Sequence, residues 1–80
     1  MKLQKAVGLR ICNLLIKHKI SRYQLCKKIN LSEQALKHII DERNKDIKLS
    51  TIAAIADGFD MSLEEFFADA LFNKKDLEIY

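Results

Sequence analysis

The chain has 80 residues, of which 49% are hydrophobic, and it contains two glycines, two cysteines and no proline. A chain of this length folds around one modest core, which leaves little room for a deep catalytic cleft. No apolar run is long enough to cross a bilayer, and no apolar segment of the signal type follows residues 1–4. We therefore expect a soluble, cytoplasmic protein without a membrane partner.

The charge is distributed unevenly along the chain, although the net charge is only +3. Residues 1–48 contain twelve lysines and arginines against four acids, a balance of +8, whereas residues 49–80 contain two lysines against seven acids, a balance of −5. The first part would attract a polyanion such as a nucleic acid. A basic surface that is merely solvated explains the same balance, so charge alone does not decide between the two.

The hydrophobic spacing predicts five short helices and no strand. Four large apolar residues recur at helical intervals near the N-terminus: Val7, Ile11, Leu14 and Leu15. They predict a first helix over residues 4–18. Ser21 caps a second helix, and Gln24 stands three residues later, which is the spacing of a capping box.

The third helix follows the second after a very short turn. Asn30 is suited to the left-handed conformation that ends a helix, and Ser32 can cap the next one. This third helix is expected over residues 33–41. A fourth helix begins at Leu49 and Ser50, and residues 61–66 begin a fifth with another capping box.

The two cysteines do not indicate a metal site. Cys12 and Cys26 are too far apart for a CxxC pair, and no second pair or histidine cluster stands at ligand spacing. We expect both to be buried, reduced thiols, and we expect no metal and no cofactor.

The third helix has two distinct faces, because each residue turns the helix by 100°. One arc is apolar and belongs to the core: Ala35, Leu36, Ile39 and Ile40. The other arc is an unbroken polar row: Glu33, Gln34, Lys37, His38 and Asp41. A surface helix normally has a solvated face, but this row stands on the second of two short helices joined by a tight turn.

These elements match a known pattern. The residues that carry it are Ser21 to Cys26, Asn30-Leu31-Ser32, Leu36, Ile39, Leu49, Ile52, Ile55-Ala56, Phe59 and Met61-Ser62-Leu63. Over roughly residues 5–68, the chain resembles the Cro/repressor type of helix-turn-helix domain, the family of phage repressors and xenobiotic-response-element-like regulators. The resemblance implies an all-α, lambda-repressor-like fold of five helices. Its helix-turn-helix lies at about residues 21–41, and its third helix enters the DNA major groove.

The resemblance also implies site residues. Base-reading positions correspond to Glu33, Gln34, Lys37 and His38. Ser32 is a phosphate-binding position by the same resemblance, and we expect the basic residues around the row to add phosphate contacts: Arg22, Lys27, Lys28, Arg43, Lys45 and Lys48. By hydrogen-bonding chemistry, Gln34 suits adenine, Lys37 suits guanine and Glu33 suits cytosine.

The chain departs from the family pattern at three positions. Arg22 stands where the family usually has a glutamine that orients a recognition side chain and binds phosphate. Leu15 and Ile40 stand where many relatives bury an arginine and a glutamate. We expect these two apolar side chains to touch, since a hydrophobic pair can replace a buried ion pair.

The C-terminal segment carries more large apolar side chains than one short helix needs. We take residues 1–72 as the helix-turn-helix domain and residues 73–80 as a tail. The tail and the helix before it can form a homodimer contact through Phe67, Leu71, Phe72, Leu77, Ile79 and Tyr80. The other possibility is that the segment folds back over its own domain as a lid.

The function expected from the sequence is a DNA-binding transcriptional regulator of the phage or prophage repressor type, which binds double-stranded DNA as a homodimer. The alternative is a protein-binding module, such as an antitoxin-like or anti-repressor partner, without strong DNA binding. An enzyme is not expected. His18 and His38 have no catalytic partner that the sequence forces into reach, and nothing indicates a small-molecule substrate.

Overall fold

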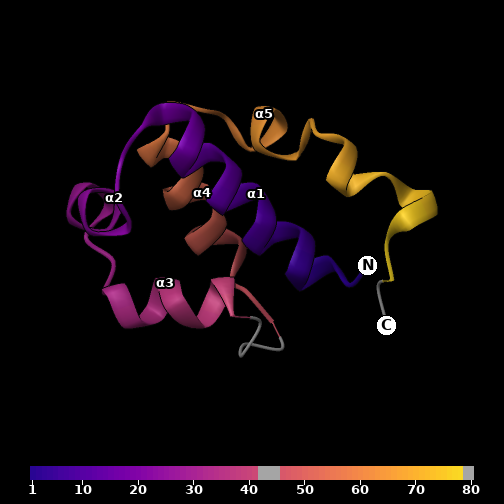
Figure 1. The fold of residues 1–80 in the computed structure, drawn as a ribbon, viewed down its shortest axis with the longest axis horizontal. Helices are drawn as coiled ribbons and strands as arrows, with labels where there is room; N and C mark the ends of the chain where they lie inside the picture. The colour runs from indigo at the N-terminus through magenta and orange to yellow at the C-terminus, as the bar shows by residue number, and fades with distance from the viewer. Residues whose placement is uncertain (42–45, 79–80) are drawn as a thin grey trace.

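The computed structural model of the chain describes residues 1–41 and 46–78. Within this part the fold is all-α, as predicted, and has five α-helices followed by two short 3₁₀ turns (Figure 1). The elements are α1 (Leu3–His18), α2 (Arg22–Ile29), α3 (Glu33–Ile40), α4 (Leu49–Gly58), α5 (Leu63–Phe67), η1 (Ala70–Phe72) and η2 (Lys74–Asp76). The predicted site residues Arg43, Lys45, Ile79 and Tyr80 lie outside the described residues.

The predicted serine caps are confirmed. The Ser21 hydroxyl accepts from the backbone N–H of Gln24 at 3.1 Å, and the Gln24 side chain accepts from the backbone N–H of Ser21 at 2.8 Å. Ser62 and Glu65 form the same capping box at the start of α5. Helices as short as α2, α3 and α5 are marginal on their own, so these caps and their buried faces fix where they begin.

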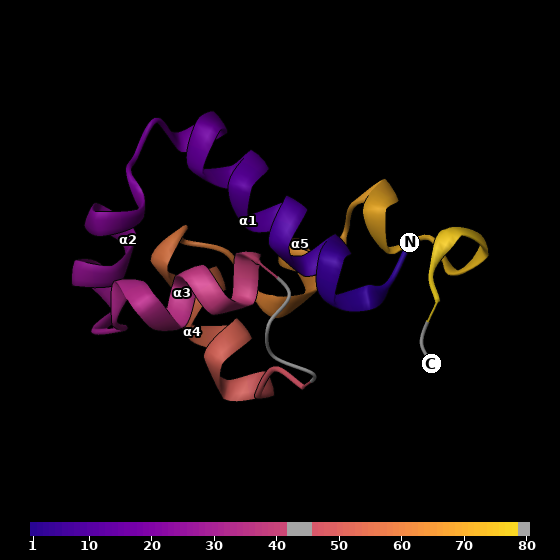
Figure 2. The ribbon, with the colours of Figure 1, turned by 60° about the horizontal axis from the view of Figure 1, so that its bottom comes forward.

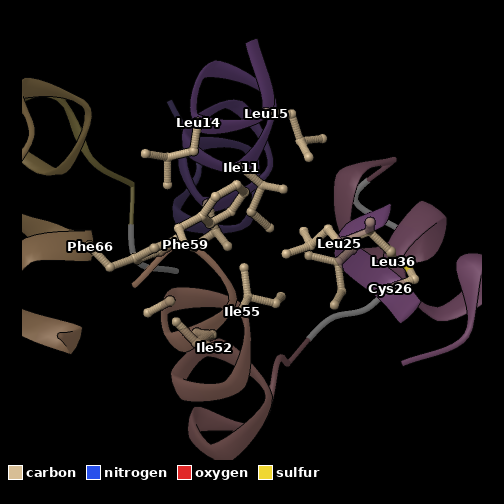
Figure 3. Packing of buried hydrophobic residues seen from close by; sticks show 13 residues of the cluster. Ile11, Leu14, Leu15, Leu25, Cys26, Leu36, Ile52, Ile55, Phe59 and Phe66 are labelled. Carbon is tan, nitrogen blue, oxygen red and sulfur yellow. The ribbon is translucent and has the colours of Figure 1, made fainter. Parts of the chain in front are cut away.

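The core lies where α1, α2, α3 and α4 converge, and α5 closes one side of it (Figure 3). Its largest fully buried side chains are Phe66, Ile11, Leu14, Leu25, Leu36 and Ile55. Both glycines mark close helix contacts. A Cβ on Gly8 would lie 3.0 Å from the carbonyl oxygen of Ile40, and one on Gly58 would lie 2.7 Å from side-chain atoms of Leu25 and Ile29.

The expected contact between Leu15 and Ile40 stays a prediction. Leu15 is buried, and Ile40 is partly buried against the same core. The backbone of Ile40 lies beside Gly8, which precedes Leu15 by two turns of α1. α3 therefore reaches α1 through a backbone contact that the family comparison did not suggest.

The C-terminal segment packs on its own chain in this structure. Phe66 is fully buried, and its ring meets those of Phe67 and Phe72, with centroids 5.1 and 6.2 Å away. Further along, residues 76–78 lie along the N-terminus (Figure 1). The terminal amine donates to the carbonyl oxygen of Asp76 at 2.8 Å, and the N–H of Glu78 donates to the carbonyl oxygen of Met1 at 2.7 Å.

Arg10 holds this segment to α1. Its guanidinium donates to the carbonyl oxygens of Phe66 at 2.8 Å and Glu65 at 3.0 Å, and to the Asp69 carboxylate at 3.1 Å. The Arg10 side chain is only 11% exposed, so these contacts are largely shielded from water. The Arg10 side chain thus supplies hydrogen-bond donors to two carbonyl oxygens at the end of α5 and to the carboxylate before η1.

The two cysteines differ, which partly corrects the expectation that both are buried. Both are free, but only Cys26 is buried, whereas Cys12 is half-buried because it lies on the side of α1 away from the core. Burial raises the pKa of the Cys26 thiol, and the nearby negative charge of Glu33 raises it further. The Cys26 thiol is therefore neutral at physiological pH.

Replacing Arg10 by Met should lower the free energy of unfolding by roughly 2–4 kcal/mol, because three charge-assisted hydrogen bonds are lost and Asp69 keeps its charge. Urea unfolding measures the change. Lys17→Met, at an exposed position of the same helix, is the matched control and should change stability by less than about 0.5 kcal/mol. Equal losses in the two variants would show that the Arg10 contacts do not stabilise the fold.

Alkaline pH should weaken the protein partly through Cys26. Above the usual cysteine pKa of about 8.5, the unfolded chain loses a thiol proton that the folded protein keeps, so the free energy of unfolding falls as pH rises. Cys26→Ala removes this contribution, and the stability difference between parent and variant should shrink from neutral to alkaline pH in urea unfolding. A difference that stays constant over this range would contradict the raised pKa.

Candidate nucleic-acid interface

The helix-turn-helix is formed by α2 and α3 and a three-residue connection. Asn30 has φ 56° and ψ 44°, the left-handed conformation predicted for it, and its N–H donates to the carbonyl oxygen of Cys26. The N–H of Leu31 donates to the same oxygen at 3.0 Å. The turn is held again at its far end, where the Cys26 thiol donates to the carbonyl oxygen of Ser32 at 3.8 Å. A small residue at position 26 therefore lets the two helices meet closely.

α3 presents the polar row to solvent, as its spacing predicted. Leu36 and Ile39 are buried in the core, at 0% and 3% exposure. The row on the other side is exposed at Glu33, Gln34, Lys37 and Asp41, and half-buried at His38. The four residues predicted to read bases therefore lie on one accessible face of one helix.

The polar row itself is not basic. It carries two carboxylates, Glu33 and Asp41, against the single ammonium group of Lys37. Glu33 also stands in the first turn of α3, where a negative charge is favourable with the helix dipole. Any attraction to a polyanion must therefore come mainly from groups around the row.

Two lysines flank the row on opposite sides. Lys27 lines a hollow of about 350 Å³ between α2 and α3, together with Ser32 and Glu33. Lys48 lines a second hollow, of about 340 Å³, between α3 and the start of α4. Lys48 is also the N-cap residue of α4 and makes no side-chain cap bond, so the first N–H groups of α4 have no side-chain acceptor there.

The other predicted phosphate-binding residues are placed unequally. Arg22 begins α2 and is exposed, and the Ser32 hydroxyl is exposed while it accepts from the N–H of Ala35 at 3.1 Å. Lys28 lies on a different side of α2, where its ammonium is 3.8 Å from the Asp60 carboxylate. That side faces the turn between α4 and α5, so Lys28 does not join the group around α3.

Tyr23 is a candidate that the sequence analysis did not select. It is 57% exposed in the first turn of α2, and it lines the same hollow as Lys27 and Glu33. An aromatic hydroxyl in this position can donate to a phosphate beside the row. Little in the sequence favoured the selection of Tyr23, since helical spacing within α2 does not show that an exposed tyrosine lies beside α3.

The described histidines and acids have contacts of other kinds. The His18 ring packs against the Phe59 ring in a tilted arrangement, with ring centroids 5.2 Å apart. Within residues 1–41 and 46–78, no group of three or more histidine, cysteine or acidic residues is placed to hold a metal ion. In the same ranges, no helix has the length and apolar character needed to cross a membrane.

Comparison with known proteins agrees with this geometry. A family model described as the Cro/C1-type HTH DNA-binding domain matches residues 10–70, which is most of the chain and includes α2, α3 and α4. No curated protein and no solved structure matches the chain significantly. The match covers the helix-turn-helix and the helices that support it, and the chain therefore belongs to the family of Cro/C1-type helix-turn-helix DNA-binding domains.

Proposed function

We propose that this protein is a sequence-specific transcriptional regulator, of the phage or prophage repressor type, that inserts α3 into the major groove of double-stranded DNA. The observation that carries the proposal is the exposed polar row of α3, flanked by Lys27 and Lys48. An α-helix fits the major groove of B-DNA, where each base pair shows a distinct pattern of donors and acceptors. The row supplies amide, ammonium, imidazole and carboxylate groups to that pattern.

Four members of the row have a base-reading role in the proposal. The Gln34 amide donates to and accepts from adenine in a bidentate pair, and the Lys37 ammonium donates to guanine O6 and N7. The Glu33 carboxylate accepts from the exocyclic amine of cytosine. His38 is half-buried at the edge of the row, so its contacts are limited to the groove wall or one base edge.

Phosphate contacts in the proposal set the position of α3. Arg22, Lys27 and Ser32 approach one strand from α2 and the turn, and Lys48 approaches the other strand from the start of α4. Arg43 and Lys45 belong to the same predicted set in sequence. Backbone N–H groups at a helix start add to such contacts, because the positive end of the helix dipole faces the phosphate.

The two carboxylates of the row affect the affinity for DNA and the discrimination between sequences differently. Glu33 and Asp41 repel phosphates, so they lower the affinity for DNA whose bases do not compensate them. Binding affinity then comes from the flanking cations, and discrimination comes from the row.

The same carboxylates are the observation that favours a second candidate function, a protein-binding module of the antitoxin-like or anti-repressor type. Selection of bound sequences from a random DNA pool at physiological salt separates the two. A defined consensus sequence supports the regulator, and a pool that stays unenriched supports the protein-binding module.

Alanine substitutions should separate phosphate contacts from base contacts. Arg22→Ala and Lys27→Ala should weaken binding to all sequences, and each should lower the salt slope by about one. Gln34→Ala should cost roughly 1–3 kcal/mol on the selected sequence and little on others. Fluorescence anisotropy over a salt series measures both effects. Lys28→Ala is the control variant. If it loses as much DNA affinity as Lys27→Ala, the face of α2 on which a lysine lies does not determine its contribution to binding.

Glu33→Gln should raise the affinity for unselected DNA by roughly threefold to tenfold, since one phosphate-repelling charge is lost. The preference for the selected sequence should fall in the same assay, because the glutamine amide oxygen accepts from cytosine in a weaker, uncharged hydrogen bond and no longer repels the phosphates of other sequences. Glu64→Gln removes an exposed first-turn carboxylate from α5 and is the matched control. No change in either affinity would remove Glu33 from the interface.

We also propose that two copies bind two half-sites as a homodimer. One helix-turn-helix grips a single half-site, and a two-fold dimer with recognition helices about one helical turn of DNA apart reaches useful affinity. In this structure Phe67 and Phe72 pack against each other, with ring centroids 4.9 Å apart, so they already contribute to their own chain. Leu71 and Leu77 are half-buried. Among the described residues of the predicted dimer contact, these two leucines supply the apolar surface that Phe67 and Phe72 do not.

The dimer proposal predicts that the intact chain self-associates in sedimentation equilibrium at tens of micromolar, and that Leu71→Glu weakens the association by about tenfold or more. Far-ultraviolet circular dichroism checks that the variant is folded. A monomer at these concentrations that occupies a palindromic site one half at a time would leave the C-terminal segment as a lid on its own domain.

A further inference from the structure

The outer face of α1 carries an apolar stripe. Ile16 is 76% exposed and Leu9 is 37% exposed, which are high values for large apolar side chains. Cys12 stands between them and is half-buried. Positions 9, 12 and 16 follow the three- and four-residue steps that bring side chains onto one face of a helix. This stripe of Leu9, Cys12 and Ile16 is the surface considered below.

The stripe lies on the side of α1 opposite the most deeply buried core residues, and its Cys12 edge adjoins the flank of α1 that meets α3. The buried side chains of α1 include Val7, Ile11 and Leu14, which the helical period places on the other side of the helix. α3 meets α1 at Gly8, on a flank of the helix. α1 runs along one edge of the helix bundle (Figure 2), and the 76% exposure of Ile16 shows that this end of the stripe is open to solvent.

The ends of the stripe are positively charged. Lys5 precedes Leu9 by four residues on the same face of α1, and Lys19 is the left-handed C-cap residue just after the end of the helix, three residues after Ile16. The 16 residues of α1 include no acidic residue. A second copy packed on this face would bring lysines against lysines in either helix direction, which disfavours self-association.

We propose that the outer face of α1 is a docking site for an amphipathic helix of another protein, with an apolar centre and acidic ends. Apolar side chains at helical spacing would cover Leu9, Cys12 and Ile16, and carboxylates at the two ends would reach Lys5 and Lys19. This is helix-on-helix recognition of the coiled-coil type, in which the apolar seam gives affinity and the end charges select the partner.

A neighbouring hollow sets a limit on the partner. It has a volume of about 640 Å³ and lies between α1 and the C-terminal segment, lined by Asn13, Met1, Leu71 and the carboxylate residues Asp69 and Asp76. Met1 is 42% exposed and supplies an apolar side chain to this hollow. The two aspartates would repel acidic groups, so the partner's carboxylates belong over the lysines and its apolar residues belong beside the hollow.

The test uses a designed helical peptide with an apolar heptad seam and glutamates at both ends, and a matched peptide with lysine in place of every glutamate. Isotope-labelled protein is titrated with each peptide and followed by NMR. The acidic peptide should shift resonances of α1 around Leu9, Cys12 and Ile16, and it should slow alkylation of the Cys12 thiol. Ile16→Glu should weaken binding by about tenfold or more. Leu49→Glu, which changes another exposed leucine on α4, should not.

DNA from the selected pool provides the second arm, since the docking face and α3 are separate. A DNA-bound protein should still bind the acidic peptide, and Ile16→Glu should bind DNA like the parent. Two results with the peptides would overturn the proposal: resonance shifts centred on α2 and α3, or equal binding of the acidic and the lysine peptide. A third would be slower alkylation of the Cys12 thiol when the concentration of the protein alone is raised. The last result would identify a second copy as the occupant.

Discussion

The position of the recognition helix α3 depends on its serine cap, its apolar face and its contact with α1. α3 has eight residues, which is too short for a helix that is stable by itself, and only Leu36 and Ile39 of its side chains are buried. The Ser32 cap fixes where it begins, and the backbone of Ile40 rests against Gly8 of α1 at the other end. With both ends and one face held, the opposite face can consist entirely of groups chosen for contacts outside the protein. The exposed polar row follows from this arrangement.

In the proposed function, the charges near α3 divide two tasks that a DNA-binding surface must perform. A uniformly basic face would bind any phosphate backbone, and its affinity would carry little sequence information. Here the cations of Lys27 and Lys48 stand beside the row, while the row contains Glu33 and Asp41. The cost of a carboxylate near phosphate is recovered only where a base donates to it, which makes that cost a source of discrimination.

Local features were predictable from the sequence, and features that need distant segments were not. The serine caps, the left-handed Asn30 and the two faces of α3 depend on residues within four positions of one another. Lys28 forms an exposed ion pair with Asp60, which is distant in the sequence, and Arg10 holds the C-terminal segment from 55 to 59 residues before its partners. Helical periodicity cannot predict pairs so far apart in the sequence. The partial burial of Cys12 also depends on which side of α1 the other helices cover, and the sequence of α1 alone does not show this.

α1 joins these features, because each of its sides has a separate role. One flank meets α3 at Gly8, the inner side fills the core, and Arg10 holds the C-terminal segment. The outer side is left with exposed Leu9 and Ile16, which folding does not use. The two proposals therefore assign different surfaces to DNA and to a helical partner, and α1 is the element that both surfaces share, through its contact with α3 at Gly8 and through the exposed Leu9 and Ile16.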